Sequence, residues 1–402
     1  MAILQRIESK LFRVGLQQSG FIAWICMVLF RLSLVLELLL QKSKPPLQNP
    51  LEREDFKKFF PELSEKISKT VEEPSRLEVK KLLQFFYYGY LHYLATGHTP
   101  KPAFLSMRAL FCHSDGKICQ EMQEFFVSHY SPHNFPPSAG ILEIPSGESI
   151  PEIVNALKTQ GYYIFKQKLP EVICEKLHAF AMETECNPQS SPNQRTKYNP
   201  LAPISVKYSL SYEDMLRNAE IRRLLSDVFL LSITQSFLLR PPCVLGPVMW
   251  WSTPYSKEPD AVAAQLYHFD FDSLNFLKFF VYLTDVGPDN GPHCFVQGSM
   301  VNKPKSLRVD RRLQDEEIEK HYDKKDIVEI DGSRGTMFLA DTRAFHKGKN
   351  LQSGDRLIFQ IVYADSLFGA EPHQTVVDSR LNSKLPSMIK QYPAIYSSFT
   401  LI

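Results

Sequence analysis

The segment QLYHFDFDSLNF, residues 265–276, alternates polar and aromatic side chains. Its polar positions are His268, Asp270 and Asp272, each separated from the next by a phenylalanine. Period-two alternation predicts a β-strand that turns the imidazole and both carboxylates to one face and the phenyl rings to the other. Such a polar face either lies in solvent at the edge of a sheet or binds a metal ion.

A candidate for a third metal ligand is His346, which follows the apolar strand candidate GTMFLA farther along the chain. If the phenyl rings of the first segment pack outward against helices, His268 and Asp270 face the interior, where an unpaired charge is costly. Two histidines and one carboxylate on one face of an octahedron form the facial triad of non-haem Fe(II) sites, which leaves three positions open. We therefore predict that His268, Asp270 and His346 are the catalytic metal ligands.

A basic residue follows this triad at the start of the strand candidate RLIFQIVYA. Arg356 lies ten residues after His346, and a hairpin would place both on neighbouring strands that face one interior. A guanidinium binds a carboxylate through two parallel hydrogen bonds, which suits the far carboxylate of 2-oxoglutarate when its other end chelates the metal. We expect 2-oxoglutarate as cosubstrate with Arg356 as its anchor, and Gln265 and Lys278 are further candidates for contacts with it.

The elements around these residues indicate a mixed α+β fold. A helix, the short strand YYIF and a second helix are expected from residue 147 onward, with another helix near 211–230. Strand candidates then follow one another from CVLGPVMWW to DRLIFQIVYA, separated by turn-rich segments such as GPDNG. Strands that are preceded rather than interleaved by helices favour a jelly-roll or cupin-like double sheet, flanked by helices, over a parallel sheet. The charged segment 306–326 is expected to be a solvated insertion between strands.

Outside this core the sequence predicts three further regions. Residues 1–45 form a hydrophobic or amphipathic helix, residues 51–135 a helical region, and residues 371–402 a C-terminal tail. The Pro-rich stretch KSKPPLQNP is typical of a linker between the first two. Residues 147–370 are left for the metal-binding domain.

The N-terminal region contains an apolar stretch, from Phe21 to Leu40, that is long enough to span a bilayer. Arg31 and Glu37 interrupt it. In a projection as one continuous helix, the polar residues on one side are Arg6, Arg13, Gln17, Arg31 and Lys42. Three alternatives remain open: a helix packed on the protein's own core or on a partner, an anchor in the membrane interface, and a spanning anchor.

Composition narrows the range of partners. The 402 residues carry a formal net charge of +2, which does not favour nucleic-acid binding. Seven scattered cysteines indicate free thiols in a reducing compartment, so we expect a cytoplasmic protein. Peripheral membrane contact through residues 1–45 is one of the alternatives that remain open. The residues that could form a zinc module are Cys112, Cys119, His129 and His133. We do not expect one, because the Cys-x6-Cys spacing differs from that of common zinc modules.

In order and spacing, these motifs resemble the phytanoyl-CoA dioxygenase family of Fe(II)/2-oxoglutarate-dependent oxygenases. The resemblance covers about residues 147–370 and rests on the opening GYYIFKQKLPEVICEKLHAF, the middle segment LKFFVYLTDVGPDNGPHCFVQGSM, and the set His268, Asp270, His346 and Arg356. It implies a double-stranded β-helix core and, by the spacing in the family, Asp270 rather than Asp272 as the ligand. The middle segment departs from the family's NG-P-L-x-x-x-PGSH at Gln297 and Met300.

The resemblance further implies hydroxylation of a small-molecule or lipid-like substrate, with release of succinate and CO2. Fe(2+), 2-oxoglutarate and O2 are the expected cofactors, with ascorbate as an accessory reductant. Related halogenases lack the triad carboxylate, so the presence of Asp270 favours hydroxylation. Two alternatives remain: a non-catalytic β-barrel homologue that binds a ligand or partner, and an oxygenase that hydroxylates proteins.

Overall fold

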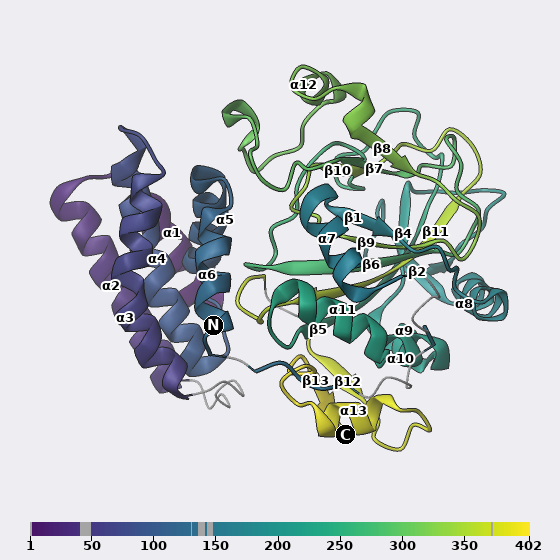
Figure 1. Ribbon diagram of the computed structural model, residues 1–402, viewed down its shortest axis with the longest axis horizontal. Coiled ribbons are helices and arrows are strands. Elements are labelled where there is room, and N and C mark those ends of the chain that lie inside the picture. Colours follow the sequence, from purple (N-terminus) through teal and green to yellow (C-terminus); the bar gives the residue numbers. More distant parts are fainter. Residues whose placement is uncertain (1, 41–49, 130, 136–140, 143–147, 371–372) are drawn as a thin grey trace.

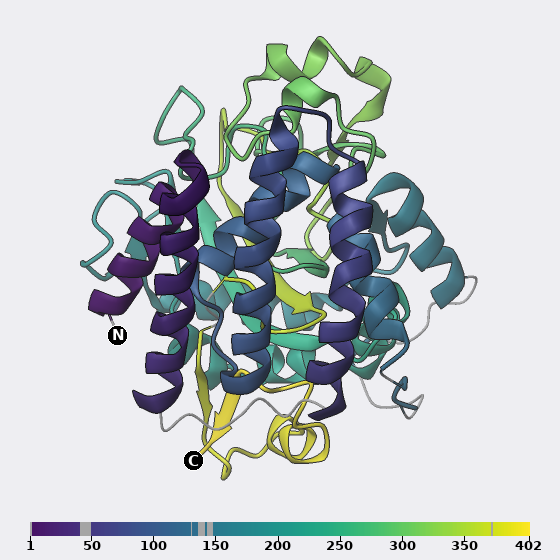
Figure 2. The same ribbon diagram turned by 90° about the vertical axis from the view of Figure 1, so that its left-hand side faces the viewer.

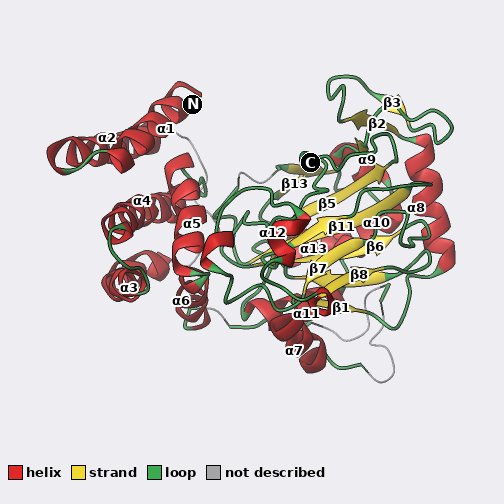
Figure 3. Cartoon of the chain, turned by 90° about the horizontal axis from the view of Figure 1, so that it is seen from above, coloured by secondary structure: helices red, strands yellow, loops and turns green. Residues whose placement is uncertain are grey.

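The computed structural model describes residues 2–40, 50–129, 131–135, 141–142, 148–370 and 373–402. The N-terminal third forms a bundle of helices that stands beside a body of β-sheets and further helices (Figure 1). From the bundle side, the purple and blue helices stand upright in front of the sheets (Figure 2). The view from above shows the bundle and the sheets as adjacent layers (Figure 3).

The bundle owes its stability to an aromatic core. Phe56, Phe86 and Tyr90 are fully buried in it, and their helical spacing is the pattern that predicted helices in residues 51–135. The described helices of the bundle are α1 Ala2–Gln17, α2 Gly20–Leu40, α3 Pro50–Lys69, α4 Ser75–Thr96, α5 Lys101–Ser114 and α6 Lys117–Val127.

The N-terminal region is a hairpin of two helices, which corrects the projection of residues 1–45 as one helix. The chain turns at Gly20, whose φ of 63° lies in the left-handed region that glycine adopts without strain. Because the turn reverses the chain, the basic residues of α1 and α2 do not share one helix face, and Lys42 lies outside the described residues. The polar residues Ser33 and Glu37 of α2 are buried against the bundle, and the guanidinium of the exposed Arg31 lies 4.6 Å from the ring centre of Tyr88.

Two antiparallel sheets form the body, so the mixed helix-and-sheet prediction is confirmed. Among the described residues, the larger sheet has the strand order β1-β9-β6-β11-β5-β4-β2-β3 and the smaller one β10-β7-β8. The strands are β1 Tyr162–Ile164, β2 Glu185–Pro188, β3 Thr196–Lys197, β4 Lys207–Ser209, β5 Cys243–Ser252, β6 Phe276–Tyr282, β7 His293–Val296, β8 Ile327–Ile330, β9 Met337–Ala340, β10 His346–Gly348 and β11 Arg356–Ala364.

The larger sheet has two differently packed faces because side chains alternate along each strand. On β6, Phe279 and Val281 pack in the core beneath the helices, whereas Phe280 and Tyr282 pack toward the smaller sheet. By the same alternation, Lys278 belongs to the face that looks toward the smaller sheet. The helices that belong to the outer core are α7 Ile150–Gln160, α8 Glu171–Glu183, α9 Tyr212–Arg217, α10 Ala219–Leu225 and α11 Val228–Leu238.

The single helix expected near 211–230 is three short helices, α9 to α11. Two side chains explain the breaks. Asn218 accepts hydrogen bonds from the first amides of α10, and Asp227 accepts them from the first amides of α11, so each begins a new helix.

The remaining segments frame the sheets. In the insertion at 306–326, the short helix α12 Asp315–Glu319 lies between two 3-10 turns, Lys305–Leu307 and Lys324–Asp326. The C-terminal tail is folded: β12 Thr375–Val377 pairs with β13 Phe399–Leu401, and α13 Leu385–Gln391 lies between them (Figure 1).

Candidate metal centre

The structure brings three of the predicted side chains to one point. Asp270 Oδ1 lies 3.6 Å from His268 Nε2, and Asp270 Oδ2 lies 3.3 Å from His346 Nε2. One ligand atom from each of the three residues lies within 4.8 Å of the others. Asp272 is not part of this group, which favours Asp270 as the carboxylate ligand, as the family spacing implied.

Backbone pairing holds the two histidines together. The amide of His268 donates to the carbonyl of His346 over 3.0 Å, and the reverse bond measures 2.8 Å. The amide of Asp270 donates to the carbonyl of Thr342 over 2.8 Å. Residues 265–275 are therefore not the regular strand that alternation predicted; they join their neighbours through isolated bridges, and the regular strand β6 begins only at Phe276.

The hydrogen bonds of the imidazoles fix their tautomers. His268 Nδ1 lies 2.9 Å from the carbonyl oxygen of Leu266, and His346 Nδ1 lies 3.0 Å from that of Ala344. Because a carbonyl oxygen only accepts, Nδ1 carries the proton in both rings. Each Nε2 lone pair is then free to bind a metal, so the donor set fits a divalent ion.

The aromatic side of the ligand segment packs against the helical bundle, as expected. Phe111 of α5 stacks on Phe271 with ring centres 4.3 Å apart, and its ring centre lies 5.3 Å from that of Phe269. Arg108 of the same helix donates to the carbonyl of Phe271 over 2.7 Å. The bundle therefore supports the ligand segment from behind.

The electrostatic environment prepares these groups for a cation. Burial, together with the neighbouring His346, lowers the pKa of His268 to about 3, so its ring is neutral at pH 7. Burial alone would raise the pKa of Asp270, but Lys278 and His346 hold it well below its usual range. Lys278 Nζ lies 2.5 Å from Asp270 Oδ2, so the predicted contact residue Lys278 neutralises the ligand carboxylate.

Arg356 lies beside the centre, but not by way of the predicted hairpin. His346 begins β10 in the smaller sheet and Arg356 begins β11 in the larger one, so the two face each other across the interior. The guanidinium approaches Gly348 so closely that a Cβ there would lie 3.1 Å from Nη2. Its Nη2 donates to Ser252 Oγ over 3.2 Å, and its Nη1 donates to the carbonyl of Gly291.

The surroundings of Arg356 fit an anion. The side chain is buried, and its Nε has no hydrogen-bond partner among the described residues. Burial lowers its pKa, which means that the cation is held in a poorly solvated place. A carboxylate would satisfy both the charge and the free N–H group.

Gln265, predicted as a contact of the cosubstrate, hydrogen-bonds to the loop that precedes it. Its Oε1 accepts a hydrogen bond of 2.7 Å from the amide of Asp260, which closes the preceding loop. The two departures from the family pattern lie outside the ligand group: Gln297 is exposed, and Met300 is buried beneath Gly161.

Three further side chains near the centre were not predicted as site residues. His293 of β7 stacks on His346 with ring centres 5.4 Å apart, and its Nε2 is buried without a hydrogen-bond partner in the described chain. Burial and the cations Arg356 and Lys278 lower the pKa of Lys207 on β4 to about 8. Arg312, from the charged insertion, interacts electrostatically with Asp270. Only the alternation of the short strand VKYS could have indicated Lys207; Arg312 has no sequence signal.

Comparison of the sequence with known protein families identifies one match. The sequence profile described as Phytanoyl-CoA dioxygenase (PhyH) matches residues 157–357, half of the chain, and spans the triad and Arg356. No curated protein matches in sequence. Among solved structures, the non-heme α-ketoglutarate-dependent epimerase SnoN from nogalamycin biosynthesis has 18% identity and a TM-score of 0.41, over 53% of this chain and 82% of SnoN.

A second structure is HygX from Streptomyces hygroscopicus with nickel, 2-oxoglutarate and hygromycin B bound. It has 17% identity and a TM-score of 0.37, over 58% of this chain and 91% of HygX. Identities and TM-scores this low do not support a transfer of function from these structures to this protein. The profile match over half of the sequence does assign the family: the chain belongs to the phytanoyl-CoA dioxygenase family.

Proposed function

We propose that the protein is an Fe(II)/2-oxoglutarate-dependent dioxygenase that hydroxylates a small-molecule or lipid-like substrate. The observation that carries this proposal is the meeting of His268, Asp270 and His346 beside a buried arginine, within the region matched by the family. In this proposal the two facing sheets are the halves of a double-stranded β-helix, with the centre between them.

Fe(II) bound here would couple the oxidation of 2-oxoglutarate by O2, to succinate and CO2, to hydroxylation of the substrate. The chain supplies geometry and charge. The Nε2 atoms of His268 and His346 and the carboxylate of Asp270 would hold the ion. Arg356, with Ser252, would orient the far carboxylate of the cosubstrate. Lys278 balances the negative charge of Asp270, a charge that the bound ion would also neutralise.

The test is anaerobic titration of the chelator-treated protein with Fe(II) and 2-oxoglutarate. The proposal predicts a weak visible charge-transfer band, and then succinate formation in air with ascorbate present. A folded protein without the band would be a non-catalytic homologue, and the proposal would fail. Screening acyl-CoAs, free fatty acids, amino acids and peptides for stimulated succinate formation separates small-molecule from protein hydroxylation.

Arg356→Gln is expected to raise the KM for 2-oxoglutarate about 100-fold, since two charge-assisted hydrogen bonds are each worth about 1.5–3 kcal/mol and glutamine replaces them only in part. The kcat at saturating cosubstrate should fall much less. Steady-state succinate assays measure both constants. Arg380→Gln, which removes an exposed arginine paired with Asp378, is the control and should change neither constant. An unchanged KM in Arg356→Gln would remove the anchor from the proposal.

Arg356 is the cation that would bind the cosubstrate, and Arg312 is a further cation beside the centre. This additional positive charge favours an anionic substrate. Arg312 is partly buried, interacts electrostatically with Asp270, and makes no side-chain hydrogen bond or ion pair within the part of the chain that the structure describes. A guanidinium in this position suits a carboxylate or phosphate group on the substrate.

Arg312→Gln is therefore expected to raise the KM for the prime substrate at least about tenfold, which corresponds to one charge-assisted hydrogen bond, and to leave the KM for 2-oxoglutarate unchanged. Arg311→Gln is the matched control, because Arg311 is exposed and already pairs with Glu317 at 2.6 Å. Equal effects of the two variants, or a change in the 2-oxoglutarate KM alone, would contradict the assignment.

We also propose that the outer side of α2 contacts an anionic lipid surface. Within the described residues, Gly20–Leu38 is the one segment long and apolar enough to cross a bilayer, and 28% of it is buried. Its other side presents large apolar residues to solvent, among them Phe21, Trp24, Leu32 and Val35. Basic residues are exposed on the same hairpin, at Arg6, Lys10, Arg13 and Arg31. Apolar side chains flanked by cations are typical of helices that lie in a membrane interface.

Replacing Phe21, Trp24 and Leu32 by serine is expected to reduce binding to phosphatidylserine-containing vesicles at least about tenfold, because each buried apolar side chain contributes about 1.5–3 kcal/mol. Cosedimentation measures the loss. The control replaces three exposed apolar residues of the body, Val172, Leu201 and Val262, by serine. Equal binding by the two variants, or binding that neither anionic lipid nor salt affects, would contradict the proposal.

A further inference from the structure

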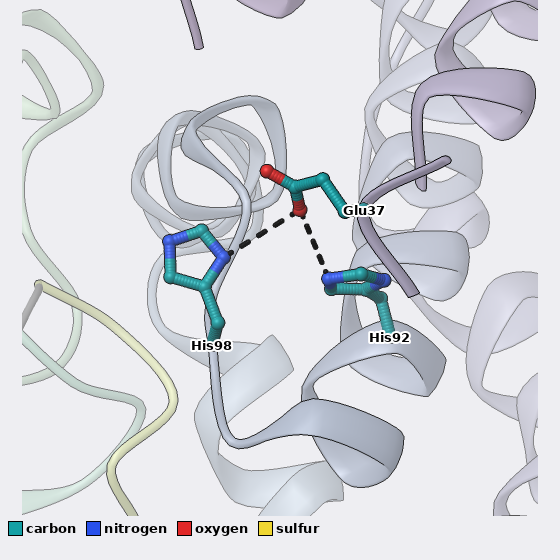
Figure 4. Close-up of side chains that lie close together, drawn as sticks. All are labelled: Glu37, His92 and His98. Carbon is teal, nitrogen blue, oxygen red and sulfur yellow. Dashed lines mark ion pairs between the residues drawn. The ribbon is translucent and has the colours of Figure 1, made fainter. Parts of the chain in front are cut away.

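A second group of metal-type ligands lies inside the helical bundle, far from the triad in sequence. Glu37 of α2 faces His92 of α4 and His98, which follows that helix (Figure 4). Glu37 Oε2 lies 3.1 Å from His92 Nε2 and 3.7 Å from His98 Nδ1. The side chains of Glu37 and His92 are 0% and 1% exposed, so this group is part of the interior.

Polar atoms in this group lack partners. Glu37 Oε2 and His92 Nε2 face each other, but Glu37 Oε1 and His92 Nδ1 make no hydrogen bond with the described residues. A second buried carboxylate, Glu8 of α1, accepts a hydrogen bond of 2.9 Å from Ser33 through Oε1, while its Oε2 has none. Buried polar groups are nearly always satisfied, so these atoms point to a missing partner.

The donor atoms indicate which kind of partner is missing. A fully buried carboxylate and two imidazoles offer oxygen and nitrogen lone pairs at one point, which is a donor set that binds a divalent cation.

The spacing fits a tetrahedral ion. Around Zn2+, with bonds of about 2.0–2.2 Å to nitrogen and oxygen, neighbouring ligand atoms lie roughly 3.3–3.5 Å apart. The two measured separations, 3.1 and 3.7 Å, lie on either side of that value. The rings of His92 and His98 are inclined at 83°, so they approach a common point from different directions.

We propose that Glu37, His92 and His98 bind a divalent zinc ion, with a water molecule as the fourth ligand. The ion would fasten the α1–α2 hairpin to α4, and so hold in place the pair of helices whose outer side is apolar. An entry route exists, because His98, 20% exposed, lines a cleft of about 680 Å³ together with Arg6 and Lys101.

Cobalt titration of the chelator-treated, full-length protein tests this site. His268→Ala combined with His346→Ala removes the triad, so any metal bound by this double variant is bound elsewhere. We expect one equivalent of Co2+ with the intense visible absorption of tetrahedral coordination, displaced by Zn2+. Adding His98→Ala should abolish this absorption. Adding His113→Ala should not, because that residue, 27% exposed on α5, is outside the group.

A second readout keeps the proposal testable if His98→Ala changes folding. Zn2+ should slow hydrogen exchange in α1 and α2 of the wild-type protein, and should fail to do so in Glu37→Gln. Absence of a tight Co2+ equivalent in the triad-free protein, or equal protection by Zn2+ in Glu37→Gln, would overturn the proposal and would indicate a metal-free Glu–His pair. Neither result depends on whether the triad is catalytic.

Discussion

His346→Ala is expected to abolish succinate formation and to weaken Fe(II) binding at the triad more than about 100-fold, since loss of a mere outer-shell partner already costs about 10–100-fold in metal affinity. The remaining pair, His268 and Asp270, cannot hold one face of the coordination sphere. Equilibrium dialysis under anaerobic conditions measures the affinity, and the charge-transfer band in the presence of 2-oxoglutarate reports the same loss.

This variant separates metal binding from folding. The contact between His268 and His346 that shapes the backbone consists of main-chain hydrogen bonds, which alanine keeps. Unfolding should therefore remain cooperative, with some loss of stability because the imidazole also stacks on His293. His321→Ala, in the exposed insertion, is the control and should retain both binding and turnover. Undiminished Fe(II) affinity in His346→Ala would exclude the triad as the metal centre.

The local pattern of residues 265–276 predicts two of the three side chains that meet at the centre. The alternation of residues 265–276 assigns His268 and Asp270 to one side and the phenyl rings to the other, and the structure keeps both assignments. It does so without a regular strand, since the segment forms single bridges to three separate partners, Leu313, His346 and Gly369. Side-chain alternation needs only an extended backbone, whereas a strand also needs a continuous partner.

Other features depend on tertiary contacts that spacing does not encode. The ten-residue interval between His346 and Arg356 suggests a hairpin, but the chain crosses from one sheet to the other. Arg312 interacts electrostatically with Asp270 from an insertion whose charged composition resembles that of any solvated loop. The group around Glu37 combines residues from α2 and α4, and no interval along the chain relates them. The hairpin turn at Gly20 was missed because apolar residues resume directly after it.

Phe111→Ala is expected to destabilise the protein by about 3–5 kcal/mol, the usual effect of removing a fully buried phenyl ring, and also to weaken metal binding at a distance. Phe111 is 2% exposed and stacks on Phe271, on the reverse side of the ligand segment. Because few backbone bonds hold that segment, its position depends on this support from α5. Denaturant unfolding measures the stability, and anaerobic dialysis measures the Fe(II) affinity of the folded protein.

Phe56→Ala is the matched control, since it removes an equally buried ring from the same bundle. Phe56 contacts Tyr90 and Phe125 but makes no ring contact with the ligand segment. Both variants should lose similar stability, and only Phe111→Ala should lower the Fe(II) affinity of the folded state. If both lower it equally, the bundle acts on the centre through global stability alone. If neither does, the ligand segment holds its shape without the bundle, and residues 51–135 have no part in positioning the triad.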